Sequence, residues 1–252
     1  MKTRDIALVA VVLAFVGFIG VQIVRTNPTR EHLAAVATPQ GEPAGSDTGS
    51  VLNAPPFPAP ERDSVDIRLR LHTAGSGTYI DHILDQNDGW LYRWPEMRLD
   101  ALRVWVQRTS DLPEWSDGWP SSASTAFDEW TAAGFPIRFE QIGDSTRARI
   151  LIRFVSSIGK GNAIGTTDTQ VDGNGWIVRA TIFIATHDPT GAPMSQELIA
   201  GVARHEIGHA LGLNHSNDPS HVMYPESRTT RISDVDRNTM HLLYMLPPGK
   251  IR

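Results

Sequence analysis

The chain has 252 residues, of which 40% are hydrophobic and 20% are charged, as is typical of a globular protein. Its net charge of −5 and the absence of a basic patch argue against nucleic acid as a partner. Because the chain contains no cysteine, disulfides, thiolate metal ligands and a thiol nucleophile are excluded.

The first segment, residues 1–25, contains an almost wholly apolar run from Ile6 to Val24. This run is about as long as a membrane-spanning helix requires. A cleaved signal peptide is the alternative, although the cleavage-site-like sequence at 35–37 lies well beyond the apolar run. We favour an uncleaved anchor. Lys2 and Arg4 precede it, which predicts a cytoplasmic N-terminus with the rest of the chain outside, whereas signal cleavage would release a secreted protein.

Residues 26–63 form a second segment, rich in Pro, Ala, Gly, Ser and Thr. The segment has neither helical nor strand periodicity, so we expect a flexible linker. The folded domain is predicted to occupy residues 64–252.

Alternating apolar residues predict about five β-strands in this domain. In LRVWVQ, for example, Leu102, Val104 and Val106 share one face. The weakest candidate, GNAIGTT, is short and flanked by glycine, which places it at a sheet edge. The predicted strands lie at 102–107, 135–142, 149–155, 161–167 and 176–185.

Three main helices are predicted around these strands. The first begins at 121–122, after a proline, and stops at Gly134, and the second runs from Ser195 to Leu211. The third begins at Ser233, forms a capping box with Asp236 and ends before Pro247. Since helices and strands mix without strict alternation, the sequence predicts an α+β domain built on a mixed, twisted sheet.

The second helix carries the chemistry of the chain, in the stretch HEIGHALGLNHS. His205 and His209 are spaced i, i+4 and therefore project from one face, where both imidazoles can reach a single zinc ion. Gly212 suits the left-handed turn that ends such a helix, and this turn returns the chain so that His215 supplies a third nitrogen. Three protein ligands leave a fourth position for water, as in catalytic zinc sites.

Glu206 lies next to the first histidine in the sequence. Its side chain is offset by about 100° on the helical wheel, which disfavours it as a fourth ligand. It is placed to remove a proton from water held at the metal, so we assign it as a general base. The alternative is a buried helix with incidental histidines, and the added Gly212 and His215 argue against it.

HEIGHALGLNH matches the signature HExxHxxGxxH, and this stretch resembles the metzincin zinc metalloproteases. HVMYP follows and is similar to their Met-turn, which implies that Met223 forms an apolar floor beneath the metal. Ser216 and the helix bearing Asp236 are similar to the matrixin branch. The resemblance covers about Tyr92 to Tyr244. The sequence shows neither the propeptide cysteine nor the hemopexin-like repeats of animal matrixins, so it resembles a minimal, prokaryote-style matrixin domain.

This resemblance implies a zinc-dependent endopeptidase that cleaves extracytoplasmic protein substrates. Zn²⁺ would be held by His205, His209 and His215, with Glu206 activating the water. An extended peptide would pair with the edge strand NAIGTT. The loop from Pro225 to Ile232 would wall the pocket for the side chain after the cut.

Further metal sites have weaker support. No HxD triplet, the element through which animal matrixins hold a second zinc, occurs between Gly159 and Thr186. Asp168, Asp172 and Asn174 are candidate Ca²⁺ ligands, but a plain turn between strands is favoured there. Four further histidines lack ligand spacing and are expected to be exposed or hydrogen-bonded: His82, His187, His221 and His241.

Two other functions are compatible with parts of this pattern. The domain could bind zinc without activity, but the retained Glu206 argues against that alternative. The chain could instead be a membrane-tethered scaffold of the cell envelope, which the long linker fits equally well.

Overall fold

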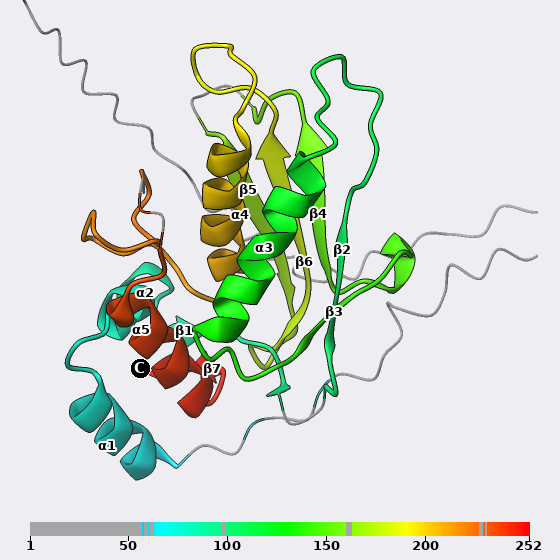
Figure 1. Ribbon diagram of the computed structural model, residues 1–252. Helices are drawn as coiled ribbons and strands as arrows, with labels where there is room; N and C mark the ends of the chain where they lie inside the picture. The colour runs from blue at the N-terminus through cyan, green and yellow to red at the C-terminus, as the bar shows by residue number, and fades with distance from the viewer. Residues whose placement is uncertain are drawn as a thin grey trace, which may run out of the picture.

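The computed structural model describes residues 57, 60, 63–96, 99–159, 163–226, 229 and 231–252. These residues form a mixed α+β fold, which confirms the predicted class (Figure 1). The predicted anchor at 1–25 and most of the predicted linker at 26–63 lie outside the described residues. Within the described part of the chain, no helix is long and apolar enough to cross a membrane.

One five-stranded sheet organises the upper part of the molecule, in the order β3-β2-β4-β6-β5. The strands β3, β2, β4 and β6 pair in parallel, whereas β5 pairs antiparallel with β6 and forms one edge of the sheet. Their bounds are β2 Leu102–Val106, β3 Phe139–Gln141, β4 Ile150–Val155, β5 Gly165–Val171 and β6 Ile177–Ala185, with a short 3-10 helix, η2, at Ser145–Arg147.

The edge strand differs most from its prediction. It begins at Gly165 and runs to Val171, through residues that were expected to form a turn. Beyond Thr167 the strand residues are exposed or only half-buried, so the sequence shows little of the alternation that marks a strand. The turn itself is confined to the residues around Asp172, whose Oδ1 accepts the backbone N–H groups of Asn174 and Trp176 at 2.9 Å each.

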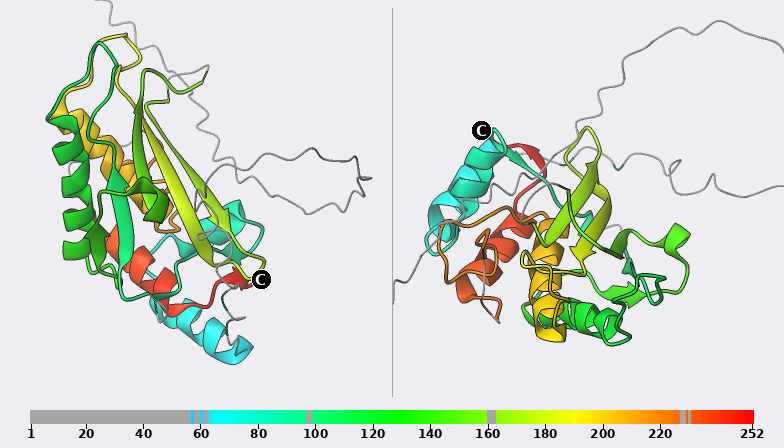
Figure 2. Two further views of the ribbon diagram at one scale, coloured as in Figure 1. Left: turned by 90° about the vertical axis from the view of Figure 1, so that its right-hand side faces the viewer. Right: turned by 90° about the horizontal axis from the view of Figure 1, so that it is seen from above.

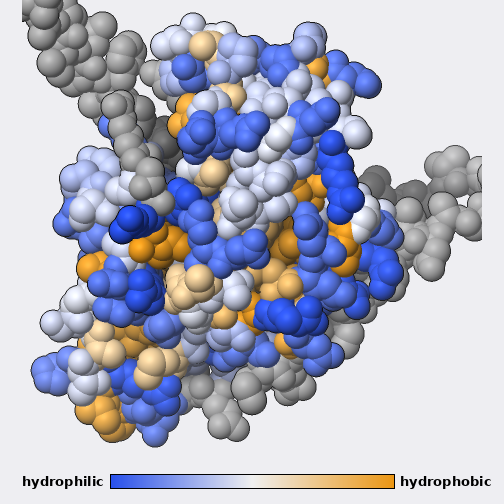
Figure 3. Space-filling view, in the orientation of Figure 1, coloured by the Kyte–Doolittle hydropathy of each residue, from blue (hydrophilic) through white to orange (hydrophobic). Residues whose placement is uncertain are grey.

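Helices α3, Trp119–Ala132, and α4, Gln196–Ala210, lie on the same face of the sheet (Figure 2). The indole Nε1 of Trp130 on α3 donates to the backbone oxygen of Arg204 on α4 at 2.9 Å. The buried guanidinium of Arg204 in turn pairs with Glu129 of α3. The outer surface over α3 is white and blue in Figure 3, because its large apolar side chains face α4 and the sheet.

The lower part of the molecule contains α5, Asp234–Met245, which begins with the predicted capping box of Ser233 and Asp236. It also contains two helices that were not predicted, α1 at Ser64–Ala74 and α2 at Ile80–Gln86. The described residues therefore hold five α-helices: the three predicted main helices, which are α3, α4 and α5, and two shorter ones that were not predicted from the sequence.

The missed helices lack an amphipathic pattern. On α1, only Ile67 is buried, while Val65 and Leu69 are exposed. Helix α2 spans seven residues, too few for a periodic pattern to be read. A short strand pair, β1 Trp90–Leu91 with β7 Gly249–Lys250, joins the beginning of this region to the end of the chain.

Gly212 ends α4 in the way that the sequence predicted. Its φ is +101°, and the N–H groups of Gly212 and Leu213 bond back to the carbonyls of His209 and Gly208. This is the bonding pattern of a Schellman C-cap. A Cβ at Gly212 would lie 2.1 Å from the backbone oxygen of Tyr92, so the turn requires both the conformation and the size of glycine.

Replacing Gly212 by alanine should therefore destabilise the fold in two ways. The left-handed backbone costs about 1–3 kcal/mol for a residue with a Cβ, and overpacking against Tyr92 adds about 1–3 kcal/mol. Gly77→Ala is the matched control, because Gly77 has a φ of +81° and no heavy atom within 4 Å of the added Cβ. Urea unfolding should show a larger loss for Gly212→Ala, and equal losses would refute the steric argument.

Candidate metal centre

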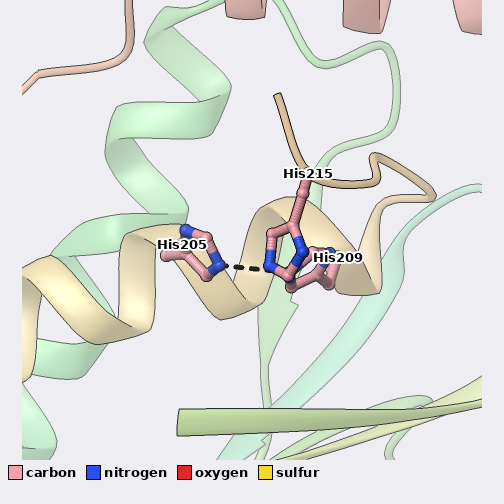
Figure 4. A group of neighbouring side chains, drawn as sticks. All are labelled: His205, His209 and His215. Carbon is pink, nitrogen blue, oxygen red and sulfur yellow. Dashed lines mark hydrogen bonds between the residues drawn. The ribbon is translucent and has the colours of Figure 1, made fainter. Parts of the chain in front are cut away.

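Three histidine rings meet beside the end of α4 (Figure 4). The Nε2 of His209 lies 3.1 Å from that of His205 and 3.2 Å from that of His215. The ligand atoms of all three lie within 4.8 Å of one another. In the part of the chain that the structure describes, no other set of three or more His, Asp or Glu side chains is arranged to hold a metal.

The outer nitrogen of two rings fixes which nitrogen carries the proton. His205 Nδ1 lies 2.7 Å from the backbone oxygen of Val222, and His209 Nδ1 lies 2.8 Å from that of Leu213. A carbonyl oxygen can only accept, so both Nδ1 atoms are donors and both Nε2 atoms of the neutral rings present lone pairs.

Two facing lone pairs cannot form a hydrogen bond with each other, whereas a cation between them satisfies both. A tetrahedral zinc ion with Zn–N bonds of about 2.0–2.1 Å places its ligand nitrogens about 3.3 Å apart. The separations of 3.1 and 3.2 Å fit that geometry. The donor set of His205, His209 and His215 therefore fits zinc.

Burial keeps the three rings in the neutral state that metal binding requires. It lowers the pKa of His205 and takes that of His209 well below its usual value. The pKa of His215 falls to about 4, first through burial and then through the neighbouring charges of His205 and His82. The lowered pKa values therefore favour the neutral form of the rings, which is the form that binds a metal.

The segment that carries His215 is held by the end of α2. Gln86 Nε2 donates to the backbone oxygen of His215 at 3.1 Å. The buried Asn87 accepts a hydrogen bond from the side chain of Asn214 at 2.8 Å. These supporting residues were missed in the sequence, because α2 itself was not recognised there.

Met223 lies directly against α4. It is fully buried, and a Cβ at Gly208 would meet its Sδ at 2.3 Å. Gly208 therefore lets the Met223 side chain approach the helix one residue before His209. This packing is compatible with the apolar floor expected of Met223, whose role stays a prediction.

The buried carboxylate of Asp236 ties α5 to the same turn. Its Oδ2 accepts the N–H of Val222 at 2.9 Å and that of Ser233 at 3.0 Å. Its Oδ1 accepts the hydroxyl of Tyr79 at 3.2 Å. Since the carbonyl of Val222 accepts a hydrogen bond from the ring of His205, Asp236 indirectly supports one of the three candidate metal ligands.

Ser216 fastens the segment between the third histidine and Met223. Its Oγ lies 2.6 Å from Nδ1 of His221, and its N–H donates to the backbone oxygen of Met223 at 2.9 Å. The ring of His221 also stacks on Tyr79. His221 is thus buried and hydrogen-bonded, one of the two environments expected for it.

Glu206 follows His205 in the sequence and is buried. Its side chain is 4% exposed, and Oε2 accepts the hydroxyl of Thr167 at 2.7 Å. Burial raises the pKa of Glu206 to about 7, and the hydrogen bond from Thr167 opposes that rise. The candidate calcium ligands, for which a plain turn was the favoured interpretation, are spread along β5 and the turn after it: Asp168, Asp172 and Asn174.

The Asp236 contact predicts a large cost for a small change. In Asp236→Asn, an NH₂ group replaces one acceptor among backbone donors, so the free energy of unfolding should fall by about 2–4 kcal/mol. Asp234→Asn is the control, since its side chain lies in the same first turn and is 86% exposed. Its effect should stay within about 0.5 kcal/mol. Urea unfolding of the zinc-free proteins measures both, and a small loss for Asp236→Asn would contradict the assigned role.

The amino-acid sequence is similar to those of several known metalloproteinases. Metalloendoproteinase 1 of Glycine max is 30% identical over 152 residues, covering 55% of this chain and 50% of that protein. Metalloendoproteinase 1-MMP of Arabidopsis thaliana is 31% identical over 143 residues, covering 53% of this chain and 39% of that protein. Matrix metalloproteinase-9 of Canis lupus familiaris is 32% identical over 115 residues, covering 44% of this chain and 16% of that protein.

The chain thus spans half or less of the length of these relatives. The family model for matrixins matches residues 104–245, which is more than half of the chain and includes all three histidines. The chain belongs to the matrixin family.

Proposed function

We propose that this chain is a zinc-dependent endopeptidase that hydrolyses peptide bonds of proteins outside the cytoplasm. The main support for the proposal is the convergence of three imidazole nitrogens, with Nε2 of His209 lying 3.1 Å from Nε2 of His205 and 3.2 Å from Nε2 of His215. The family match and the names of the metalloendoproteinase relatives support it.

The three histidines would hold the metal: His205 and His209 from α4, and His215 from the segment after it. When bound, zinc supplies a Lewis acid for the scissile carbonyl and lowers the pKa of water towards about 7. Two of the rings are pre-oriented by backbone carbonyls, so they need not reorganise to bind.

Glu206 is proposed as the general base. It would accept a proton from the attacking water as the water oxygen bonds to the carbonyl carbon. The same proton would then pass to the leaving nitrogen as the carbon–nitrogen bond breaks, so that no further proton donor is required. The burial of Glu206 shields its carboxylate from bulk water.

The edge strand β5 is proposed to bind the substrate. An extended peptide can add to a free sheet edge through backbone hydrogen bonds, and β5 ends the sheet next to α4. The strand runs over Gly165–Val171, so this segment replaces the shorter stretch at 162–167 as the candidate. The loop at 225–232 is proposed to wall the side-chain pocket, with 227, 228 and 230 outside the described residues.

The location of the protein is proposed from the sequence. The apolar run at 6–24 supports a membrane anchor with the metal centre outside the cytoplasm, and signal cleavage with secretion is the alternative. The chain would then meet its protein substrates in an extracytoplasmic compartment.

Glu206→Gln should separate catalysis from metal binding. Loss of the base is expected to reduce kcat/KM for a quenched peptide by about 10²–10⁴-fold, while zinc content stays at one ion per chain. Glu197→Gln, an exposed glutamate in the first turn of the same helix, is the control and should keep wild-type activity.

Two results would overturn the proposal. Undiminished hydrolysis by Glu206→Gln would refute the assignment of the base. A wild-type protein that binds one zinc but cleaves nothing in a diverse peptide library would instead indicate a zinc-binding module or a scaffold.

A further inference from the structure

The carboxylate of Glu206 rests on two residues of the edge strand, Gly165 and Thr167, which we call the Glu206 seat. Both residues are buried and lie on the face of β5 that turns toward α4. They are two positions apart, and successive strand residues alternate between faces, so they share this face. The residues between and after them are more exposed.

Thr167 provides the polar half of the seat. Its Oγ1 lies 2.7 Å from Oε2 of Glu206 and 3.1 Å from the backbone oxygen of the same residue. A hydroxyl can both donate and accept, so the contact with the carboxyl group persists whether or not that group holds a proton. Thr167 is 8% exposed, which leaves little water to compete for the hydrogen bond.

Gly165 provides the space. A Cβ at this position would lie 2.3 Å from Oε1 of Glu206 and 2.7 Å from a methyl carbon of Val202. One carboxylate oxygen therefore bonds to Thr167, while the other packs against the backbone of Gly165. Together these contacts restrict both the rotation and the tilt of the carboxylate.

The seat is itself fixed by the sheet. In the antiparallel ladder between β5 and β6, Gly165 is paired with Ile184 and Thr167 with Ile182. Since β5 is also the strand proposed to bind the substrate, the peptide and the base would be held by the same seven residues.

We propose that Thr167 is a positioning residue, which aims the Glu206 carboxylate from the substrate-binding strand. This inference rests on the proposed function of Glu206 as the general base. The sequence alone did not reveal that β5 would contact both the substrate and the base. Because the same strand would hold both, the position of the peptide relative to the Glu206 carboxylate would not depend on the Glu206 side-chain conformation alone.

The test is Thr167→Val, which replaces the hydroxyl by a methyl group of similar size. A misaimed base should lower kcat by about 10–100-fold, with KM changed by less than about threefold. Zinc affinity, measured by competition with a chromophoric chelator, should equal that of the wild type. Thr167→Ser keeps the hydroxyl and should recover most of kcat, while Thr181→Val on β6 makes the same chemical change elsewhere in the sheet and should have no effect.

A second readout needs neither zinc nor substrate. In zinc-free protein, Thr167→Val and Glu206→Ala each remove the same hydrogen bond, the one between Thr167 and Glu206. The shift in urea midpoint of the double variant should therefore be smaller than the sum of the two single shifts. Additive shifts would overturn the inference. So would a loss of zinc affinity that parallels the loss of kcat, or a failure of Thr167→Ser to recover activity.

The two proposals fail in different ways. If Glu206→Gln keeps its activity, the general base is assigned wrongly and the seat has no catalytic role. If Glu206→Gln is inactive and Thr167→Val keeps the wild-type kcat, the base stands and the positioning role of Thr167 is refuted.

Discussion

The candidate metal centre depends on keeping three imidazole rings turned toward one another, so that their ligand nitrogens stay within 4.8 Å. Each of the two rings on α4 is held from behind by a backbone carbonyl, one on Val222 and one on Leu213. Neither carbonyl belongs to the regular part of α4. The site therefore depends on how the chain leaves the helix and returns to it, and less on the helix itself.

Different devices secure the two carbonyls. Leu213 is placed by the glycine turn that ends α4, since its own N–H bonds back to Gly208. Val222 is placed by Asp236, whose carboxylate reaches the turn from the first residues of α5. The ring of His205, a candidate metal ligand, and the buried Asp236, 31 positions away along the chain, are thus joined through one peptide unit.

The N-terminal helices contribute to the centre although they precede the family match at 104–245. Tyr79 bonds to Asp236, and Gln86 bonds to the backbone of His215. Trp94 donates from its indole nitrogen to the last residue of α4, Ala210, at 2.8 Å. These contacts make the segment before the matched region part of the support of the metal centre.

The features that the sequence predicts correctly are those encoded by residues close together in the chain. The pair His205 and His209 was predictable because helical spacing alone places both on one face. The capping box at Ser233 and the turn at Gly212 were predictable for the same reason, since each is encoded within a few residues. The predicted strands of the sheet interior were found because their apolar residues alternate.

The contacts that the sequence did not reveal join distant elements. Thr167 contacts Glu206 because β5 packs on α4. Gln86 contacts His215 because the end of α2 lies beside the segment that follows α4. Helix α1 lacked an apolar stripe, and the polar outer residues of β5 resembled a turn. Such features follow from tertiary packing, which local patterns do not contain.

The proposed coordination by three histidines can be measured by X-ray absorption at the zinc edge of the zinc-loaded protein. We expect one zinc per chain with three imidazole nitrogens at about 2.0–2.1 Å and one further light atom. In His215→Ala the number of imidazoles should fall to two. A wild-type spectrum with fewer than three imidazoles, or one unchanged by His215→Ala, would contradict it.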